Sequence, residues 1–311
     1  MTPRLMLLDT ASLYFRAYFG VPDSVRAPDG TPVNAVRGLL DFITRLVGEY
    51  RPTHLACCWD NDWRPQWRVE LIASYKAHRV ERTAPPGSAG SRYVEVVPGP
   101  LAAQVPVIVE VLEAFGIAVV GADGYEADDV IGTLATGAGM PVDVVTGDRD
   151  LFQLVDDDAE VRVLYTARGV GRHERVTNQT VRDRYGIEGR QYADFAALRG
   201  DPSDGLPGVA GVGEKTAATL LSRFGSLTGL LEAMLDPTSD LAPGPRRRLK
   251  DAAAYLEVAP RVVGVVRDLG LGGPDLSLPR TPRHPDRLVA LSERWGLGGS
   301  AGRLVDTLSN R

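Results

Sequence analysis

Along the first half of this chain, apolar segments that end in an acidic residue alternate with helical patterns. The segment "RLMLLD" ends at Asp9, "HLACCWD" ends at Asp60 and "VDVVTGD" ends at Asp148, and stretches with apolar residues at three- and four-residue spacing lie between them. This alternation predicts an α/β domain whose mainly parallel sheet is flanked by helices. The carboxyl ends of parallel strands share one edge of a sheet, where ligands bind, so these acids are expected to meet there.

Acidic residues at strand ends, at the start of a helix or in a turn form a larger set with the same expected location. The set comprises Asp9, Asp60, Glu126, Asp128, Asp129, Asp148, Asp150, Asp201 and Asp204. So many carboxylates cannot crowd one edge as bare anions, because like charges force protonation or require a cation. An all-oxygen set favours Mg²⁺ or Mn²⁺, and two such ions about 3.5–4 Å apart can hydrolyse a phosphodiester. Any single acid could instead be a turn former or favour a helix N-terminus, but that does not explain the whole set.

A basic segment with interleaved aromatic residues, residues 64–82, follows the second acidic strand end. As a helix it would place five side chains on one face, namely Arg64, Arg68, Tyr75, Lys76 and Arg79. Such a stripe suits phosphate contact together with base stacking on single-stranded nucleic acid. The alternative is an ordinary solvated helix face, which is the weaker interpretation beside a metal cluster.

Beyond about residue 170, glycine-rich turns alternate with short helical patterns, which indicates a second, mostly helical domain. We therefore expect one domain over residues 1–172 and another over 173–311. The segment "GVAGVGEKTA", residues 208–217, is a Gly-x-Gly turn that runs into a helix, so its N–H groups can hold a phosphate of duplex DNA. A plain turn between helices is the alternative. The segment "RRRLK", residues 246–250, either extends this DNA track or is a solvated patch, and the sequence leaves both open.

The overall charge and the N-terminus exclude some classes of protein. The net charge is −5, so any binding of nucleic acid must come from local basic patches rather than from the whole surface. The first apolar run is short and stops at Asp9, which argues against a signal peptide or a membrane span and favours a cytoplasmic protein.

Five segments, in order, resemble the bacterial 5′-3′ exonuclease and flap endonuclease family, which includes the N-terminal nuclease domain of DNA polymerase I. They are "LLDTASLYFRAYFG", "WD" followed by "ELIASYKAHR", "GYEADDVIGTLA", "VTGDRDLFQLV" and "RGDPSDGLPGVAGVGEKTA". The resemblance runs from about residue 4 to 260, and five motifs in the right order are far more specific than one glycine-rich loop.

The resemblance implies a PIN-like (resolvase-like) nuclease domain with an arch region at about residues 62–100. A helix-hairpin-helix-type domain with its turn at about 206–225 would follow. The nine acids would hold two or more divalent ions directly or through water. Lys76 and Arg79 would contact the scissile phosphate, Tyr75 would stack on a base, and Arg16 would touch DNA. The turn that binds duplex backbone would use Gly208, Gly211, Gly213, Lys215 and Thr216, and relatives also hold K⁺ there.

These features together predict a metal-dependent, structure-specific 5′ nuclease with 5′-3′ exonuclease and 5′-flap endonuclease activity. It would remove RNA primers and flaps in replication and repair. The expected partners are DNA with a 5′ flap or 5′ end and RNA–DNA primer junctions, with a sliding clamp or a DNA polymerase as a further candidate. We expect a nucleoid-associated monomer that does not bind a membrane.

Two rival functions remain for testing. One is a catalytically silent junction-binding protein, against which the complete acid set argues. The other is a PIN-type ribonuclease, a class that is usually shorter and lacks the second domain.

Two departures from the family pattern accompany the resemblance. Thr10 stands where the family usually has glycine, which is a mild change. The stretch from Val80 to Val97 is longer than in relatives, so the arch is expected to differ in shape, and its residues 83–92, rich in Pro, Gly and Ser, are expected to form a mobile loop.

Overall fold

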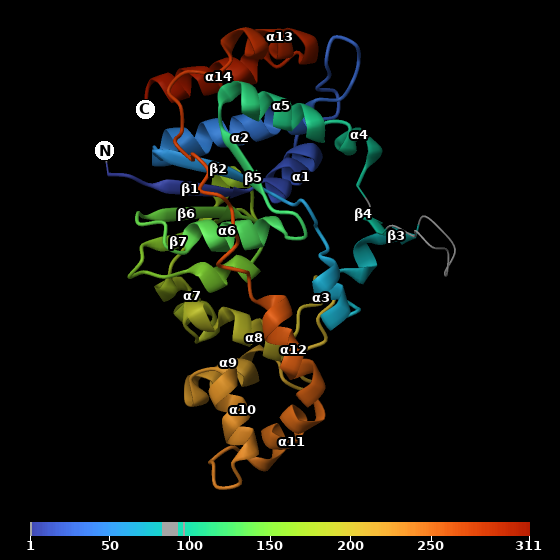
Figure 1. Cartoon of the computed structure of the whole chain (residues 1–311), viewed down its shortest axis with the longest axis vertical. Coiled ribbons are helices and arrows are strands. Elements are labelled where there is room, and N and C mark those ends of the chain that lie inside the picture. Colours follow the sequence, from blue (N-terminus) through green and yellow to red (C-terminus); the bar gives the residue numbers. More distant parts are fainter. Residues whose placement is uncertain (1, 83–92, 96) are drawn as a thin grey trace.

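A six-stranded sheet forms the centre of the larger part of the molecule (Figure 1). The computed structural model describes residues 2–82, 93–95 and 97–311. The sheet order is β5-β2-β1-β6-β7-β8, and every neighbouring pair is parallel except β7 and β8. The strands are β1 (Leu5–Asp9), β2 (His54–Trp59), β5 (Ala118–Gly121), β6 (Val142–Thr146), β7 (Val161–Tyr165) and β8 (Glu174–Val176). The predicted α/β fold with a mainly parallel sheet is confirmed.

Helices cover both faces of this sheet, as a buried parallel sheet requires. In β1, Leu5 and Leu7 join one core, whereas Met6 and Leu8 join the core on the opposite face. The helices on the second face are α1 (Thr10–Gly20), α2 (Asn34–Tyr50) and α5 (Val105–Phe115). The elements on the first face are α6 (Ala127–Ala135), the 3₁₀ helix Asp150–Leu154 and α8 (Tyr192–Arg199).

A group of further helices extends the first core away from the sheet, toward the lower end of the molecule in Figure 1. They are α7 (Asn178–Tyr185), α9 (Glu214–Phe224), α10 (Leu227–Leu235), α11 (Pro243–Asp251) and α12 (Ala253–Val263). One continuous apolar cluster runs from the sheet through these helices, so the helical domain and the sheet domain share a core.

The chain returns to the sheet domain after α12. The last two helices, α13 (Pro285–Trp295) and α14 (Gly298–Ser309), pack against α5 and α2. Their Leu288, Leu291, Leu304 and Leu308 belong to the core on that face. The structure therefore differs from the predicted division at both ends, because β8 lies in the sheet and the C-terminal helices do not belong to the helical domain.

The segment expected to be one basic helix is broken. Only α3 (Gln66–Leu71) is helical; the backbone is extended at Ile72 and left-handed at Lys76 (φ 47°), and a 3₁₀ turn spans Ala77–Arg79. Two short antiparallel strands, β3 (Val80–Arg82) and β4 (Tyr93–Glu95), lead to α4 (Gly99–Ala102). The loop 83–92, to which the prediction of a mobile, longer arch applies, lies outside the described residues.

No helix in the described parts of the chain combines the length and apolar character that a membrane crossing requires.

Candidate active site

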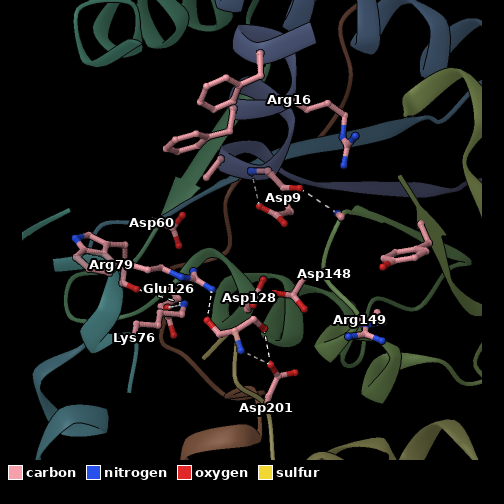
Figure 2. Close-up of a pocket in the computed structure, with 18 of the residues that line it drawn as sticks. Asp9, Arg16, Asp60, Lys76, Arg79, Glu126, Asp128, Asp148, Arg149 and Asp201 are labelled. Carbon is pink, nitrogen blue, oxygen red and sulfur yellow. Dashed lines mark hydrogen bonds and ion pairs between the residues drawn. The ribbon is translucent and has the colours of Figure 1, made fainter. Parts of the chain in front are cut away.

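A cleft of about 920 Å³ opens at the carboxyl edge of the sheet (Figure 2). Six of the nine predicted acids line it, and Figure 2 shows them around one space: Asp9, Asp60, Glu126, Asp128, Asp148 and Asp201. They come from the ends of β1 and β2, the start of α6, the loop after β6 and the loop after α8. The expectation that strand-end acids meet at one edge is therefore met, while their role as metal ligands stays a prediction.

Local hydrogen bonds hold these carboxylates in place. Asp9 caps α1, since its Oδ1 accepts the N–H of Ser12 at 3.1 Å, and its Oδ2 accepts the Thr146 hydroxyl at 2.7 Å. Asp60 Oδ1 accepts the N–H of Ala127, the first residue of α6, at 2.7 Å. Asp9 and Asp60 thus each tie their own strand end to a neighbouring element.

Burial and repulsion from neighbouring acids raise the pKa of two of these carboxyl groups, Asp9 and Asp128. Burial, with Asp60 and Asp148 nearby, raises the pKa of Asp9 to about 7. Burial, followed by repulsion from Asp9 and Asp148, holds the pKa of Asp128 well above its usual range. A group that is buried among like charges returns to the ionised form when a cation binds beside it.

A second group of acids lies beside the first. Asp150 is 9% exposed, and its Oδ1 is buried without a hydrogen-bond partner among the described residues. Burial and repulsion from Asp148, Asp204 and Asp201 hold the pKa of Asp150 well above its usual range. Burial also raises the pKa of Asp204 to about 6, although Lys76 and Arg79 offset part of this effect.

This chemistry fits hard divalent cations. The donors are oxygens, and the partnerless oxygen of Asp150 is buried within the same acidic group. Among the residues that the structure describes, no three carboxylates lie close enough to ligate one ion as they stand, so binding would draw them together.

Two basic side chains reach the cleft from the base of the arch. Lys76 forms an ion pair with Glu126, and its backbone N–H donates to the carbonyl of Asp204 at 2.9 Å. Arg79 Nη2 donates to Asp204 Oδ1 at 2.9 Å and to the carbonyl of Ser203 at 2.7 Å. Both cations therefore lie where a phosphodiester would approach the acids.

Three predicted site residues are buried away from any ligand. Arg68 is 2% exposed and pairs with Glu126 and Asp129, so the prediction that it contacts DNA is wrong. Tyr75 is 3% exposed and its hydroxyl donates to Glu126 at 2.6 Å, so it cannot stack on a base. Asp129 is fully buried and both of its oxygens accept from Arg68, which leaves no room for a metal ion. Tyr75 follows the break after α3, whereas Arg68 lies within α3 and Asp129 lies in the first turn of α6.

Arg64, also predicted to bind DNA, helps to close this broken segment. Its Nε donates to the carbonyl of Tyr75 at 2.6 Å and its Nη2 donates to the carbonyl of Ala73 at 3.3 Å. A DNA contact by Arg64 stays a prediction.

The cleft also contains residues that were not singled out from the sequence. They are Ser12, Phe15, Phe19, Trp63, Arg149 and Tyr165. Phe15 and Phe19 lie four residues apart on α1 and flank the predicted Arg16, so helical spacing alone could have identified them. Arg149 lies between Asp148 and Asp150 in the sequence, so its position beside two predicted ligands could have identified it as a cleft residue.

The glycine turn of the helical domain has the predicted form. Gly208 (φ 67°) and Gly211 (φ 74°) have left-handed backbones, and Gly213 begins α9 without a side-chain cap. The exposed Lys215 lies in the first turn of α9, next to the half-buried Thr216. This leaves the first N–H groups of the helix available to an anion.

The basic segment 246–250 has more than one role. Arg246 donates to the carbonyls of Ala233 and Met234 at 2.9 and 2.7 Å, so it stabilises the end of α10. Arg248 Nη1 donates to the carbonyl of Gly211 at 2.9 Å and thus supports the glycine turn. The sequence left open whether this segment binds DNA or is a solvated patch. For Arg246 and Arg248 the contacts indicate a third, structural role.

Gly208→Ala is expected to destabilise the protein by about 2 kcal/mol or more. The new Cβ would lie 2.4 Å from the backbone nitrogen of Gly200, and φ is positive. Urea unfolding measures the free energy. Gly213→Ala is the control, because its φ is −94° and no atom lies within 4 Å of the added Cβ. Equal losses in both variants would contradict the steric argument.

Divalent ions are expected to stabilise the protein strongly at high pH and weakly at low pH. The pKa of Asp9 is about 7 in the folded protein, whereas its ordinary value is 3.8. As pH rises, the unfolded chain therefore releases this proton at a lower pH than the folded protein does. Between these values the free energy of unfolding of the metal-free protein therefore falls as pH rises. Metal binding requires the ionised carboxylate and reverses this loss.

Thermal unfolding in EDTA and in Mn²⁺ at about 100 times its Kd gives the stabilisation by the metal. This gain in the free energy of unfolding should reach about 2.7 kcal/mol near pH 8 and vanish near pH 5. Asp9→Asn should flatten the pH dependence in EDTA. A stabilisation by Mn²⁺ that is equal at both pH values would contradict the prediction.

Comparisons with known proteins agree with this geometry. The model of the family "5′-3′ exonuclease, N-terminal resolvase-like domain" matches residues 4–186, and "5′-3′ exonuclease, C-terminal SAM fold" matches residues 187–283. A 5′-3′ exonuclease of Streptomyces coelicolor is 62% identical over 304 residues, which cover 98% of this chain and 100% of that protein. A 5′-3′ exonuclease of Mycobacterium tuberculosis is 51% identical over 99% of both chains.

Among solved structures, the bacteriophage T5 D15 flap endonuclease, complexed with DNA and metal ions, has a TM-score of 0.61 at 16% identity. The match covers 99% of this chain and 100% of the T5 chain. Human GEN1 in complex with Holliday junction DNA has a TM-score of 0.60 at 17% identity, and that match covers 99% of this chain and 73% of the GEN1 chain. Such low identities show the shared fold. The family models span both domains and the relatives match over their full lengths, so this chain belongs to the 5′-3′ exonuclease family.

Proposed function

We propose that this chain is a divalent-metal-dependent, structure-specific 5′ nuclease that cleaves DNA near the junction between a 5′ single strand and duplex. One observation carries the proposal. Carboxylates from both domains surround one cleft, which two arch-base cations, Lys76 and Arg79, also reach. Carboxylates that repel one another suit metal ions, and the cations suit a phosphate, so the cleft favours phosphodiester hydrolysis.

The residues have distinct roles in this proposal. Asp9, Asp60, Asp128 and Asp148 would hold one group of ions, and Asp150, Asp201 and Asp204 would hold or orient another. Glu126, whose two oxygens pair with Arg68 and Lys76, would orient these basic residues instead. Bound Mg²⁺ or Mn²⁺ would lower the pKa of a water and offset charge on the phosphate. Lys76 and Arg79 would stabilise the negative charge that grows on the phosphate oxygens in the transition state. A histidine base is not required.

The helical domain would bind the duplex. Gly208, Gly211 and Gly213 shape a turn that leads into α9, whose N-terminus has no side-chain cap, and Lys215 adds positive charge beside it. This contact is to backbone phosphates, so it selects for duplex structure rather than for sequence. K⁺ held by main-chain carbonyls of the turn, as the family resemblance implies, belongs to the same proposal.

The biological role that fits is the removal of RNA primers and 5′ flaps in replication and repair. DNA with a 5′ flap or a 5′ end would be the substrate, and the protein would act as a monomer in the nucleoid. A sliding clamp or a DNA polymerase is the partner class that such a role would need.

A cleavage assay tests the proposal. A 5′-flap duplex, the same duplex without a flap and a plain RNA strand are incubated with protein and Mg²⁺, Mn²⁺ or EDTA. We expect metal-dependent cutting close to the flap junction that leaves a 5′-phosphate. Tight flap binding without any cutting would favour the silent junction binder, whereas preferred cutting of the RNA strand would favour the ribonuclease.

A further inference from the structure

A buried ion-pair network links the arch base to both domains. The guanidinium of Arg68 donates to Asp129 Oδ1 at 2.7 Å and Oδ2 at 2.9 Å, and it pairs with Glu126. Its Nε donates to the carbonyl of Val262, at the end of α12, at 3.1 Å. Arg68 does not line the cleft, yet it contacts the nuclease domain and the helical domain at the same time.

Asp129 fixes the guanidinium. Its Oδ1 also accepts the N–H of Val266 at 2.9 Å, and its Oδ2 accepts the N–H of Glu126 at 3.2 Å. The segment after α12 lies tightly on α6, since a Cβ at Gly132 would lie 2.6 Å from the carbonyl oxygen of Val266. A fully satisfied buried network of this kind is rigid, and removal of one charge would leave another unpaired.

Glu126 connects this network to Lys76. One of its oxygens accepts from Arg68 and from the Tyr75 hydroxyl, and the other pairs with the Lys76 ammonium. Lys76 also has a left-handed backbone (φ 47°), which a lysine rarely adopts. A strained residue keeps its conformation only where its surroundings determine it fully. The Lys76 ammonium also donates to the carbonyl of Trp63 at 3.4 Å, and the carboxylate that pairs with it, Glu126, is one that Arg68 holds in turn.

We propose that Arg68 is a positioning residue that holds Lys76 in the cleft through Glu126, with Asp129 and the end of α12 fixing its guanidinium. The inference rests on the proposed function, in which Lys76 contacts the scissile phosphate. Arg68 itself does not touch the substrate. Loss of the Arg68–Asp129 pair should release Lys76 while the duplex-binding turn stays intact.

The test removes the pair as a unit, because a single substitution would leave a buried charge without a partner. The variant is Arg68→Met with Asp129→Asn. The control is Arg162→Met with Asp143→Asn, which removes the ion pair of another fully buried aspartate, 2.7 Å between Arg162 Nε and Asp143 Oδ1. Asp143 also pairs with Arg4 at 3.0 Å, and the partly exposed Arg4 keeps access to water in the control. Asp143 lies near the start of β6, at the end of the strand opposite to the cleft.

The first readout is the chemical reactivity of Lys76. The chain has only three lysines, Lys76, Lys215 and Lys250, and the other two are exposed internal references. In the wild type, acetylation by acetic anhydride, followed by mass spectrometry, should be slower at Lys76 than at the references. It should rise about tenfold at Lys76 in the Arg68/Asp129 variant and stay unchanged in the control.

The second readout is cleavage of a 5′-flap duplex. The single-turnover rate should fall about 10²-fold in the Arg68/Asp129 variant, while the Kd for the duplex changes less than about threefold. Unchanged Lys76 acetylation in a variant that unfolds at the same urea concentration as the control would overturn the proposal. So would a rate loss matched by an equal loss of duplex affinity, since Arg68 would then only seat the helical domain.

A second variant covers the case in which the double variant does not fold. Arg68→Lys keeps the positive charge but cannot span Asp129 and Glu126 with paired N–H groups. Lys76 acetylation should rise in it as well, and a wild-type acetylation rate would overturn the proposal. Failure of the wild type to cleave any flap would refute the proposed function, whereas the acetylation readout would still decide the role of Arg68.

Discussion

Asp148→Asn is expected to abolish metal-dependent cleavage, with a loss of about 10³-fold or more in single-turnover rate. Asp148 lines the cleft and contributes to the raised pKa of Asp9, Asp128, Asp150 and Asp204, so it lies between the two groups of acids. Loss of its charge weakens ion binding at the centre of the site, and metal ions supply several kcal/mol of transition-state stabilisation.

Asparagine keeps the size of the side chain and an oxygen that can accept the N–H of Asp150, as Asp148 Oδ1 does at 2.9 Å. The turn after β6 should therefore stay folded, and flap affinity should stay within a few-fold of the wild type in Ca²⁺ or EDTA. Asp158→Asn, an exposed acid in the turn before β7, is the control and should cleave normally. Normal cleavage by Asp148→Asn in saturating Mg²⁺ would remove the main support for a carboxylate metal site.

Lys76→Met is expected to lower the single-turnover rate about 10²- to 10³-fold with little change in flap affinity. The ammonium is one of two arch-base cations at the cleft, and its effect should grow as charge develops on the phosphate. Because Met and Lys face the same left-handed backbone at this position, the strain is similar in both proteins. Single-turnover kinetics and binding by fluorescence anisotropy separate the two quantities.

Lys76→Arg provides the comparison. It keeps the charge but replaces a compact ammonium with a planar fork, so it should restore part of the rate that Lys76→Met loses. A loss of flap affinity equal to the loss of rate would instead assign Lys76 to ground-state binding. Equal rates in the Met and Arg variants would show that charge at this position does not matter.

The acidic half of the site could be predicted because its position follows from topology. Asp9, Asp60 and Asp148 each end a strand, and parallel strands place their carboxyl ends along one edge. The order of strands in the sheet did not have to be known. The same reasoning placed Glu126 and Asp128 correctly, since a helix that follows a strand begins at that edge.

The basic half could be predicted only in part, because its geometry depends on contacts far apart in sequence. Helical spacing put Arg68 and Tyr75 on the same face as Lys76. The helix ends at Leu71, but residues 66–79 contain no glycine or proline that would have indicated this end. The partners that turn Arg68 inward, Glu126 and Asp129, lie about sixty residues away. Asp129 was misassigned for the same reason, since an acid beside two candidate ligands has the same sequence context whether it faces a metal or an arginine.

The return of the chain to the sheet after α12 restricts how the helical domain can move. That domain is covalently joined to the nuclease domain at both of its ends, after β8 and after α12, and α13 and α14 then pack on α5 and α2. A body tethered at two points can turn easily only about the line that joins them, whereas a body on a single linker can swing in every direction. The duplex-binding turn and the cleft should therefore keep nearly the same separation in free and DNA-bound protein. Little conformational entropy would then be lost when one DNA molecule contacts both.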